Sequence, residues 1–159
     1  MFKQIAALTV GIMIVLGLNA IATAIDNPEV YEKPLPEPVP VAQLEINDHI
    51  DKMAKRYGLN PDVIKALIEE ESGWGESAEG DNGQSVGLMQ IQERWHKDRM
   101  KRLGVTSLYD PEQNITVGCD ILSELLSKYG NYEDALSVYN SGNIYDGKQY
   151  AERVLNAAK

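Results

Sequence analysis

The chain has 159 residues, of which 43% are hydrophobic and 25% are charged, and this composition fits one globular domain with its own core. Its formal net charge of −9 argues against a nucleic-acid partner, because such a protein needs a basic surface. A single cysteine, Cys119, cannot form an internal disulfide, and His49 and His96 stand far apart, so we expect a buried, inert thiol and no metal site.

The first segment, residues 1–24, has the pattern of a secretory signal peptide. Lys3 precedes an apolar run that ends in Ala-Thr-Ala, and we expect cleavage after Ala24. The uncharged stretch from Ile5 to Ile25 is also about long enough to stay in a bilayer as an uncleaved anchor. Both alternatives place the remainder of the chain outside the cytoplasm.

A proline-rich linker is expected over residues 25–43. Four prolines alternate with other residues, which blocks helix and central strand and favours polyproline II: Pro34, Pro36, Pro38 and Pro40. Such a spacer extends about 3 Å per residue, so it could carry a domain away from a membrane. It could instead serve as a proline-rich ligand for a partner.

Residues 44–159 form the predicted domain, which is mainly α with little sheet. The expected helical segments are Leu44–Tyr57, Pro61–Ser72, Gly87–Gly104, 111–129, Tyr132–Asn140 and Gln149–Ala158. In the third of these, Leu88, Ile91 and Trp95 keep helical spacing. Residues 75–86 have no periodicity and indicate a loop. The basic run from Arg94 to Arg102 either borders a groove or is a solvated face.

Three consecutive glutamates close the second of these helices. A helix turns about 100° per residue, so Glu69 is expected to face solvent, Glu70 to lie at the boundary and Glu71 to face the core. A desolvated carboxylate is costly unless it is paired or protonated, and a raised pKa is what a general acid requires. A helix end can also hold such a residue through a local cap or salt bridge, so helical position alone leaves both interpretations open.

Four motifs occur in order between about Asn60 and Leu155: "ALIEEESGW", "GLMQIQ", "DPEQNITVGCDIL" and "ALSVYNSG". Together they resemble the lytic transglycosylases, in particular the soluble-transglycosylase type of catalytic domain, which is related to goose-type lysozyme. Two positions depart from the family pattern: Val138 stands where alanine is common, and Gln92-Glu93 stand where Asn-Pro or Met-Pro is common. The turn after the second motif is therefore expected to differ.

The resemblance implies a lysozyme-like helical fold with Glu71 as the catalytic acid and base. It assigns substrate binding and cleft formation to Ser72, Gly87, Leu88, Met89, Gln90, Tyr139 and Asn140. The hydroxyl of Tyr139 is expected to point toward the glutamate or the sugar. Asn114 is expected either to belong to the motif or to cap its helix.

The reaction that the resemblance implies is cleavage of the β-1,4 bond between N-acetylmuramic acid and N-acetylglucosamine in peptidoglycan, with formation of a 1,6-anhydro ring. It requires one carboxyl group and neither metal nor organic cofactor. The expected partners are the glycan strands of peptidoglycan and, in addition, a cell-envelope or secretion machine. Contact with a membrane is expected only through the N-terminal segment, if that segment stays uncleaved.

Three alternatives remain at the level of the sequence. The first is a hydrolytic muramidase of the same fold, in which Asp81 or another acid positions a water molecule. The second is a catalytically silent wall-binding or assembly module. The third is a helical adaptor that binds through its proline-rich spacer.

Overall fold

The computed structural model describes residues 41–159, and these residues are mainly helical, with one small hairpin. The elements in chain order are α2 (Val41–Tyr57), α3 (Pro61–Ser72), β1 (Glu79–Gly80), β2 (Ser85–Val86), α4 (Glu93–Leu103), α5 (Pro111–Tyr129), α6 (Tyr132–Ser141) and α7 (Lys148–Ala157). The predicted signal segment and nearly all of the predicted linker lie outside the described residues. Within the described range, the structure contains no helix with the length and apolar character that a membrane crossing requires.

The helix ends follow from local capping chemistry. The side chain of Asn60 accepts a hydrogen bond from the backbone N–H of Asp62, and Pro61 occupies the first turn of α3. Gly73 ends α3 in the left-handed conformation, with φ of 56°. Asp110 caps α5 with a side chain that accepts a 2.9 Å hydrogen bond from the backbone N–H of Gln113. These residues confirm the predicted boundaries of both helices.

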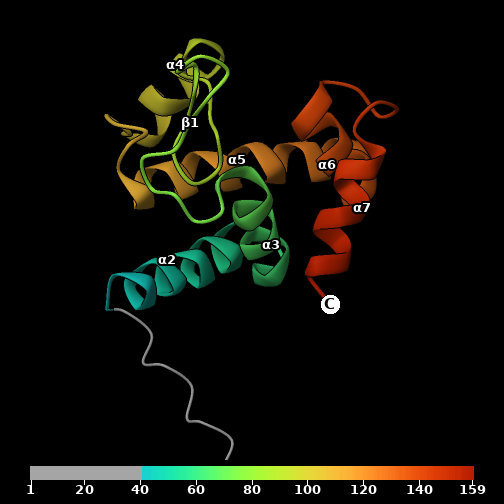
Figure 1. Ribbon diagram of the computed structural model, residues 1–159, viewed down its shortest axis with the longest axis horizontal. Coiled ribbons are helices and arrows are strands. Elements are labelled where there is room, and N and C mark those ends of the chain that lie inside the picture. Colours follow the sequence, from blue (N-terminus) through green and yellow to red (C-terminus); the bar gives the residue numbers. More distant parts are fainter. Residues whose placement is uncertain (1–40) are drawn as a thin grey trace, which may run out of the picture. The chain divides into compact units, whose positions relative to one another are not determined.

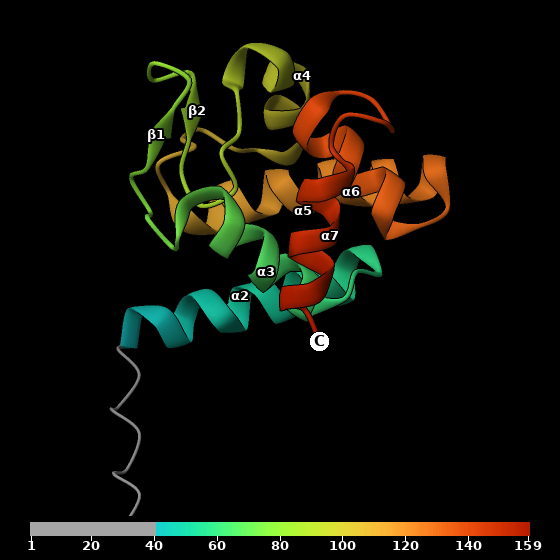
Figure 2. The ribbon, with the colours of Figure 1, turned by 45° about the vertical axis from the view of Figure 1, so that its right-hand side comes forward.

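Helix α5 runs through the middle of the described unit, with α2 and α6 packed against it (Figure 1). Helix α7 packs on α6 and returns the chain to α3, so the last helix lies beside the helix that carries the three glutamates (Figure 2). Ile115, Val117 and Leu122 of α5 are fully buried at this centre. The core therefore joins elements from both ends of the domain.

The segment from Gly87 to Gly104 is not one helix, and this prediction is wrong for its first third. Residues 87–92 form a tight turn that returns Ile91 to an isolated antiparallel bridge with Val86. Gly87 and Gln90 both have positive φ, 74° and 46°, which a helix does not allow. Helix α4 begins only at Glu93, and the helical stripe does not form, because Trp95 is 72% exposed.

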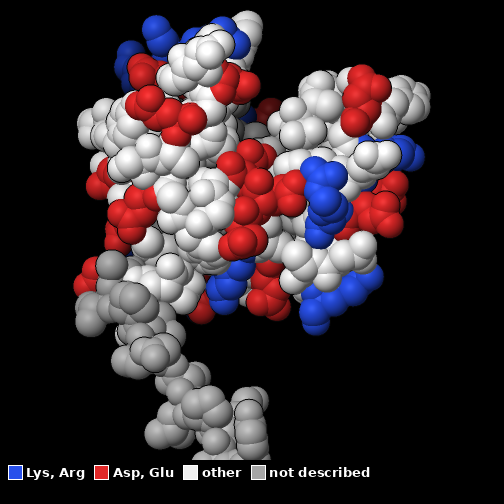
Figure 3. Space-filling model, viewed as in Figure 1, with Lys and Arg blue, Asp and Glu red and all other residues white. Residues whose placement is uncertain are grey.

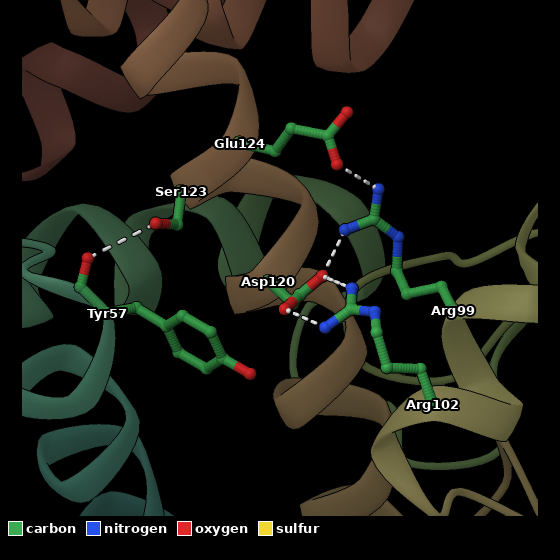
Figure 4. A network of polar contacts seen from close by, with 6 residues as sticks. All are labelled: Tyr57, Arg99, Arg102, Asp120, Ser123 and Glu124. Carbon is green, nitrogen blue, oxygen red and sulfur yellow. Dashed lines mark hydrogen bonds and ion pairs between the residues drawn. The ribbon is translucent and has the colours of Figure 1, made fainter.

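The basic run is divided between two environments. Arg99 and Arg102 form ion pairs with Asp120 of α5, and Arg99 also pairs with Glu124 (Figure 4). The side chain of Arg99 is only 15% exposed, so Arg99 attaches α4 to α5 rather than facing solvent.

Cys119, the residue before Asp120 on α5, is buried. Burial raises the pKa of its thiol to about 12, as expected for an inert cysteine.

Candidate active site

A cavity of about 360 Å³ lies where the end of α3, the hairpin, the turn before α4 and the end of α6 meet. Its lining residues are Glu71, Gly80, Asp81, Ser85, Gln90, Ile91, Gln92, His96, Ile121, Tyr139 and Asn140. Figure 3 shows the surface hollowed between the part that carries α4 and the part that carries α6, with Asp and Glu atoms gathered along the hollow. The lining is mostly polar, which suits a hydroxyl-rich ligand.

Glu71 is the glutamate whose side chain enters this cavity. Glu69 and Glu70 are exposed, whereas Glu71 is partly buried, in the order that helical geometry predicts. Burial raises the pKa of the Glu71 carboxyl, and the negative charges of Glu70 and Asp81 add to this rise. The group therefore holds its proton to a higher pH than an exposed glutamate does.

Tyr150 of α7 is the residue that sequence reasoning missed. Its hydroxyl donates a hydrogen bond to Oε1 of Glu71, and this bond partly opposes the effect of burial on the pKa of Glu71. Burial and the adjacent Glu71 carboxylate raise the pKa of Tyr150 far above its ordinary value, so the phenol stays a donor. The only sign of Tyr150 in the local sequence is that it shares an apolar helical stripe with Val154, and both residues are buried.

A second contact between α3 and α7 lies beside the first. Arg153 donates a 2.8 Å hydrogen bond from Nε to Oε1 of Glu70, and its Nη2 forms an ion pair with the same oxygen at 2.6 Å. Its guanidinium also lies 6.0 Å from the centre of the Tyr150 ring. The pair balances the charge of Glu70, which stands next to Glu71 on α3.

Ser72 and Asn114 hold the floor of the cavity together. The Ser72 hydroxyl lies 3.1 Å from the carbonyl of Ile68 and 2.9 Å from that of Leu88, so it links α3 to the turn before α4. Asn114 is fully buried and accepts a 2.8 Å hydrogen bond from the N–H of Met89. Its amide also donates 2.8 Å bonds to the carbonyls of Val86 and Leu108. Asn114 thus fixes this turn from α5 rather than capping a helix.

Of the four residues of the "GLMQ" turn, Gln90 lines the cavity, and Gly87, Leu88 and Met89 lie behind the lining. Leu88 and Met89 are fully buried, so their side chains support the cleft from the core. A side chain at Gly87 would collide with Asn114 and with the carbonyl of Leu108, which explains the glycine. Gln90 lines the cavity, and its Nε2 donates to the carbonyls of Ala78 (3.1 Å) and Gly87 (2.9 Å).

Tyr139 and Asn140 form the opposite wall, from the end of α6. The hydroxyl of Tyr139 donates a 2.8 Å hydrogen bond to the carbonyl of Met89. Its partner is therefore the backbone of the turn and not Glu71, which was one of the two partners expected, the other being the sugar. Asn140 is exposed at the cavity edge.

Four further polar residues line the cavity besides those that the resemblance assigned to the site, and only the first was named before, for the hydrolytic alternative: Asp81, Ser85, Gln92 and His96. His96 of α4 lines it, and burial followed by the nearby Arg99 lowers the pKa of its imidazole, which favours the neutral form at pH 7. Asp81 lines it from the hairpin, where its Oδ2 accepts hydrogen bonds from Ser85 (2.6 Å) and Gln92 (2.9 Å). Within residues 41–159, no three His, Cys, Asp or Glu side chains gather as a metal site would require.

The sequence profile described as "Transglycosylase SLT domain" matches residues 48–156. The chain belongs to this family. The SLT domain thus covers the described helices from α2 to α7, and the resemblance drawn from the four motifs is confirmed.

Curated relatives match the same part of the chain. A transglycosylase of Enterobacteria phage PRD1 is 34% identical over 93 residues, which is 58% of this chain and 33% of the phage protein. The invasion protein IagB of Salmonella typhimurium is 32% identical over 94 residues, which is 55% of this chain and 58% of IagB. The chain therefore spans about a third to three fifths of the length of these relatives.

The fold also matches that of a solved lytic transglycosylase. Slt from Pseudomonas aeruginosa superposes with a TM-score of 0.62 at 25% identity, over 70% of this chain and 23% of that protein. That structure is of an inactive mutant in which one glutamate is replaced by glutamine. The SLT domain of this chain therefore has the mainly α, lysozyme-like fold that its sequence predicts.

Proposed function

We propose that this protein is a peptidoglycan lytic transglycosylase in which Glu71 serves first as acid and then as base. The observation that carries the proposal is the Glu71 carboxyl, which lies in a polar cavity with a raised pKa and one neutral hydrogen-bond donor, Tyr150. Membership of the SLT family supports cleavage of murein as the general activity.

In the first step, protonated Glu71 donates its proton to the oxygen that leaves N-acetylmuramic acid. The acetamido group of the same sugar supplies the stabilisation that a second protein carboxylate gives in ordinary glycosidases. In the second step, ionised Glu71 removes the proton of the sugar's 6-hydroxyl, whose oxygen closes the 1,6-anhydro ring. The carboxyl ends protonated, so a single residue completes the cycle.

Tyr150 is proposed to position the carboxyl in both steps. A donor on Oε1 fixes one oxygen and leaves the other free to exchange the proton. The Glu70–Arg153 pair holds α7 against α3 next to this contact. The walls formed by Gln90, Tyr139 and Asn140 are proposed to bind the sugars on either side of the bond that breaks.

The test is mass analysis of the fragments released from purified peptidoglycan. The unmodified chain should release fragments that end in an anhydro sugar, and each of these is lighter by one water than a reducing end. Glu71→Gln should reduce release by about a thousandfold or more, because it removes the proton donor and acceptor together. Glu70→Gln is the matched control, since it makes the same change one residue away. A greater loss from Glu70→Gln than from Glu71→Gln would contradict the assignment.

A second function, hydrolysis of the same bond, is favoured by one observation: Asp81 lines the same cavity as Glu71. Two carboxyl groups flanking a glycosidic bond are the arrangement that activates water. In that case every product would carry a reducing end, and Asp81→Asn would abolish activity as thoroughly as Glu71→Gln. We expect Asp81→Asn to keep anhydro products, because Asp81 already accepts hydrogen bonds from Ser85 and Gln92.

The setting of the protein follows as part of the same proposal. Peptidoglycan lies outside the cytoplasm, so residues 1–24 are proposed to export the chain and residues 25–40, which precede α2, to separate the domain from the membrane. Similarity to an invasion protein and to a phage transglycosylase makes action during passage of a machine through the wall a reasonable role. Removal of residues 26–40 should leave activity on soluble glycan intact, whereas an adaptor that binds through this spacer would lose its function.

A further inference from the structure

Trp95, in the first turn of α4, is 72% exposed and stands in the chain between Gln92 and His96, two residues that line the cavity. A single exposed aromatic residue needs no explanation on its own. Tyr145, for example, is 74% exposed, and within residues 41–159 its side chain has no hydrogen bond. Trp95 differs because its indole N–H donates a 3.1 Å hydrogen bond to Oε1 of Gln92, a residue that lines the cavity.

Gln92 connects the indole to the cavity wall. Its Nε2 donates hydrogen bonds to Oδ2 of Asp81 at 2.9 Å and to Oγ of Ser85 at 3.0 Å, and both of these residues line the cavity. Its Oε1 also accepts hydrogen bonds from Arg94, whose guanidinium lies 5.0 Å from the indole centre. The ring is therefore fixed relative to the cavity, with most of its surface left accessible.

The proposed substrate gives this fixed ring a partner. A cavity of about 360 Å³ encloses a short part of a polymer, so a glycan strand must continue over the rim. A pyranose ring presents C–H groups on its face, and these fit the negative face of an aromatic ring. His96, the next residue along α4, lines the cavity, and Gln92 lines it as well, so the residues on which the indole depends belong to the proposed sugar site.

We propose that Trp95 is a stacking platform for a sugar ring of the glycan strand just beyond the cavity, held in position by Gln92. The inference rests on the proposed function for the identity of the strand. It assigns substrate binding to a residue outside the cavity, and it gives a purpose to Gln92, where the family pattern commonly has another residue.

The experiment measures binding of the full chain to purified peptidoglycan in the Glu71→Gln background, where turnover should be slower by about a thousandfold or more. Adding Trp95→Ala should weaken binding about tenfold, because the stacking face is lost. Trp95→Phe keeps an aromatic face and should stay within about threefold of the parent. Tyr145→Ala is the matched control, since it removes an equally exposed aromatic ring that is not tied to the cavity, and it should leave binding unchanged.

Kinetics of the active chain separate binding from a structural effect. Trp95→Ala should raise KM on long glycan strands about tenfold and leave kcat within about twofold, whereas a displaced α4 would lower kcat through the cavity wall. Unchanged binding by Trp95→Ala, or equal losses from Trp95→Ala and Tyr145→Ala, would overturn the inference.

A membrane contact is the competing explanation for the exposed Trp95 side chain, because Lys and Arg gather over α4 (Figure 3). If Trp95→Ala lost binding to vesicles of anionic phospholipid but kept binding to peptidoglycan, the stacking role would be wrong. If the Glu71→Gln chain failed to bind peptidoglycan at all, both the proposed substrate and this inference would be rejected. Binding by that chain with no effect of Trp95→Ala would reject the inference alone.

Discussion

Two carboxyl groups, Glu71 on α3 and Asp120 on α5, are held against a neighbouring helix in opposite ways. Glu71 meets one neutral phenol, and burial raises its pKa. Asp120 is also partly desolvated, but Arg102 and Arg99 outweigh that effect and lower its pKa (Figure 4). The comparison shows that the partner decides the role: two guanidinium groups make a carboxylate a structural anchor, and one phenol leaves a carboxyl able to exchange its proton.

The largest effect is expected on the structural side of this comparison. Asp120→Ala leaves Arg99, whose side chain is 15% exposed, without its main partner, and should cost about 3 kcal/mol in the free energy of unfolding. Urea denaturation of the two chains at pH 7 measures this difference. The pKa of Asp120 is lowered by folding, so its contribution is present above the unfolded pKa near 4 and is lost as the pH falls through the folded value. The two chains should therefore converge in acid, and a constant difference from pH 7 to pH 2 would argue against the ion pairs.

Tyr150→Phe addresses the catalytic side and should lower kcat about tenfold, because Glu71 loses the group that positions it. The hydrogen bond from Tyr150 lowers the pKa of Glu71, so its removal should raise that pKa further. The alkaline limb of the pH profile of kcat/KM should then move to higher pH. A lower kcat with an unmoved limb would mean that the phenol acts only in packing.

Glu71→Gln should raise the free energy of unfolding at pH 7 by about 1 kcal/mol, because it replaces a buried ionisable group with a neutral one. The sign follows from the raised pKa: the folded state holds the proton more tightly, so the wild-type carboxyl destabilises the fold only above its unfolded pKa. Thermal denaturation at pH 7 and at pH 3 should show a gain that disappears in acid. A loss of stability at pH 7 would indicate that the carboxylate is well solvated.

Glu70→Gln is expected to have the smallest effect, with kcat within about threefold of the parent. It removes a negative charge that raises the pKa of Glu71 and leaves Arg153 unpaired, and both changes favour ionised Glu71. The alkaline limb of the pH profile should move slightly to lower pH, opposite to the shift expected for Tyr150→Phe. Shifts in the same direction for both variants would contradict this electrostatic account.

The sequence predicts the helices well where local chemistry defines their ends. Asn60 with Pro61, and Asp110 with Pro111, begin helices in the structure as capping rules require. The prediction fails over residues 87–92, where Leu88 and Ile91 are buried by a turn and a bridge and not by a helical stripe. Apolar spacing over so short a stretch does not distinguish these cases.

The site is predicted only in part, because its residues come from distant parts of the chain. Helical geometry indicates that Glu71 is the one of three adjacent glutamates that faces the core, but only the resemblance to the family assigns it a role. Helical geometry does not reveal Tyr150, which lies 79 residues further along and meets Glu71 only because α7 packs on α3. The links of Gln92 to Asp81 and Trp95 are likewise side-chain contacts that no periodicity records.

The three hydrogen bonds of Asn114 have a consequence for motion. They attach the turn that forms the cavity floor to α5, and Ser72 attaches the same turn to the helix that carries Glu71. The turn that forms the cavity floor and the helix that carries Glu71 should therefore move as one rigid body on the timescale of substrate entry. Under the proposed function, any widening of the cleft that admits a glycan strand must then come from the α4 wall or the α6 wall. Amide hydrogen exchange should be slow at Met89 and faster at the cavity edges.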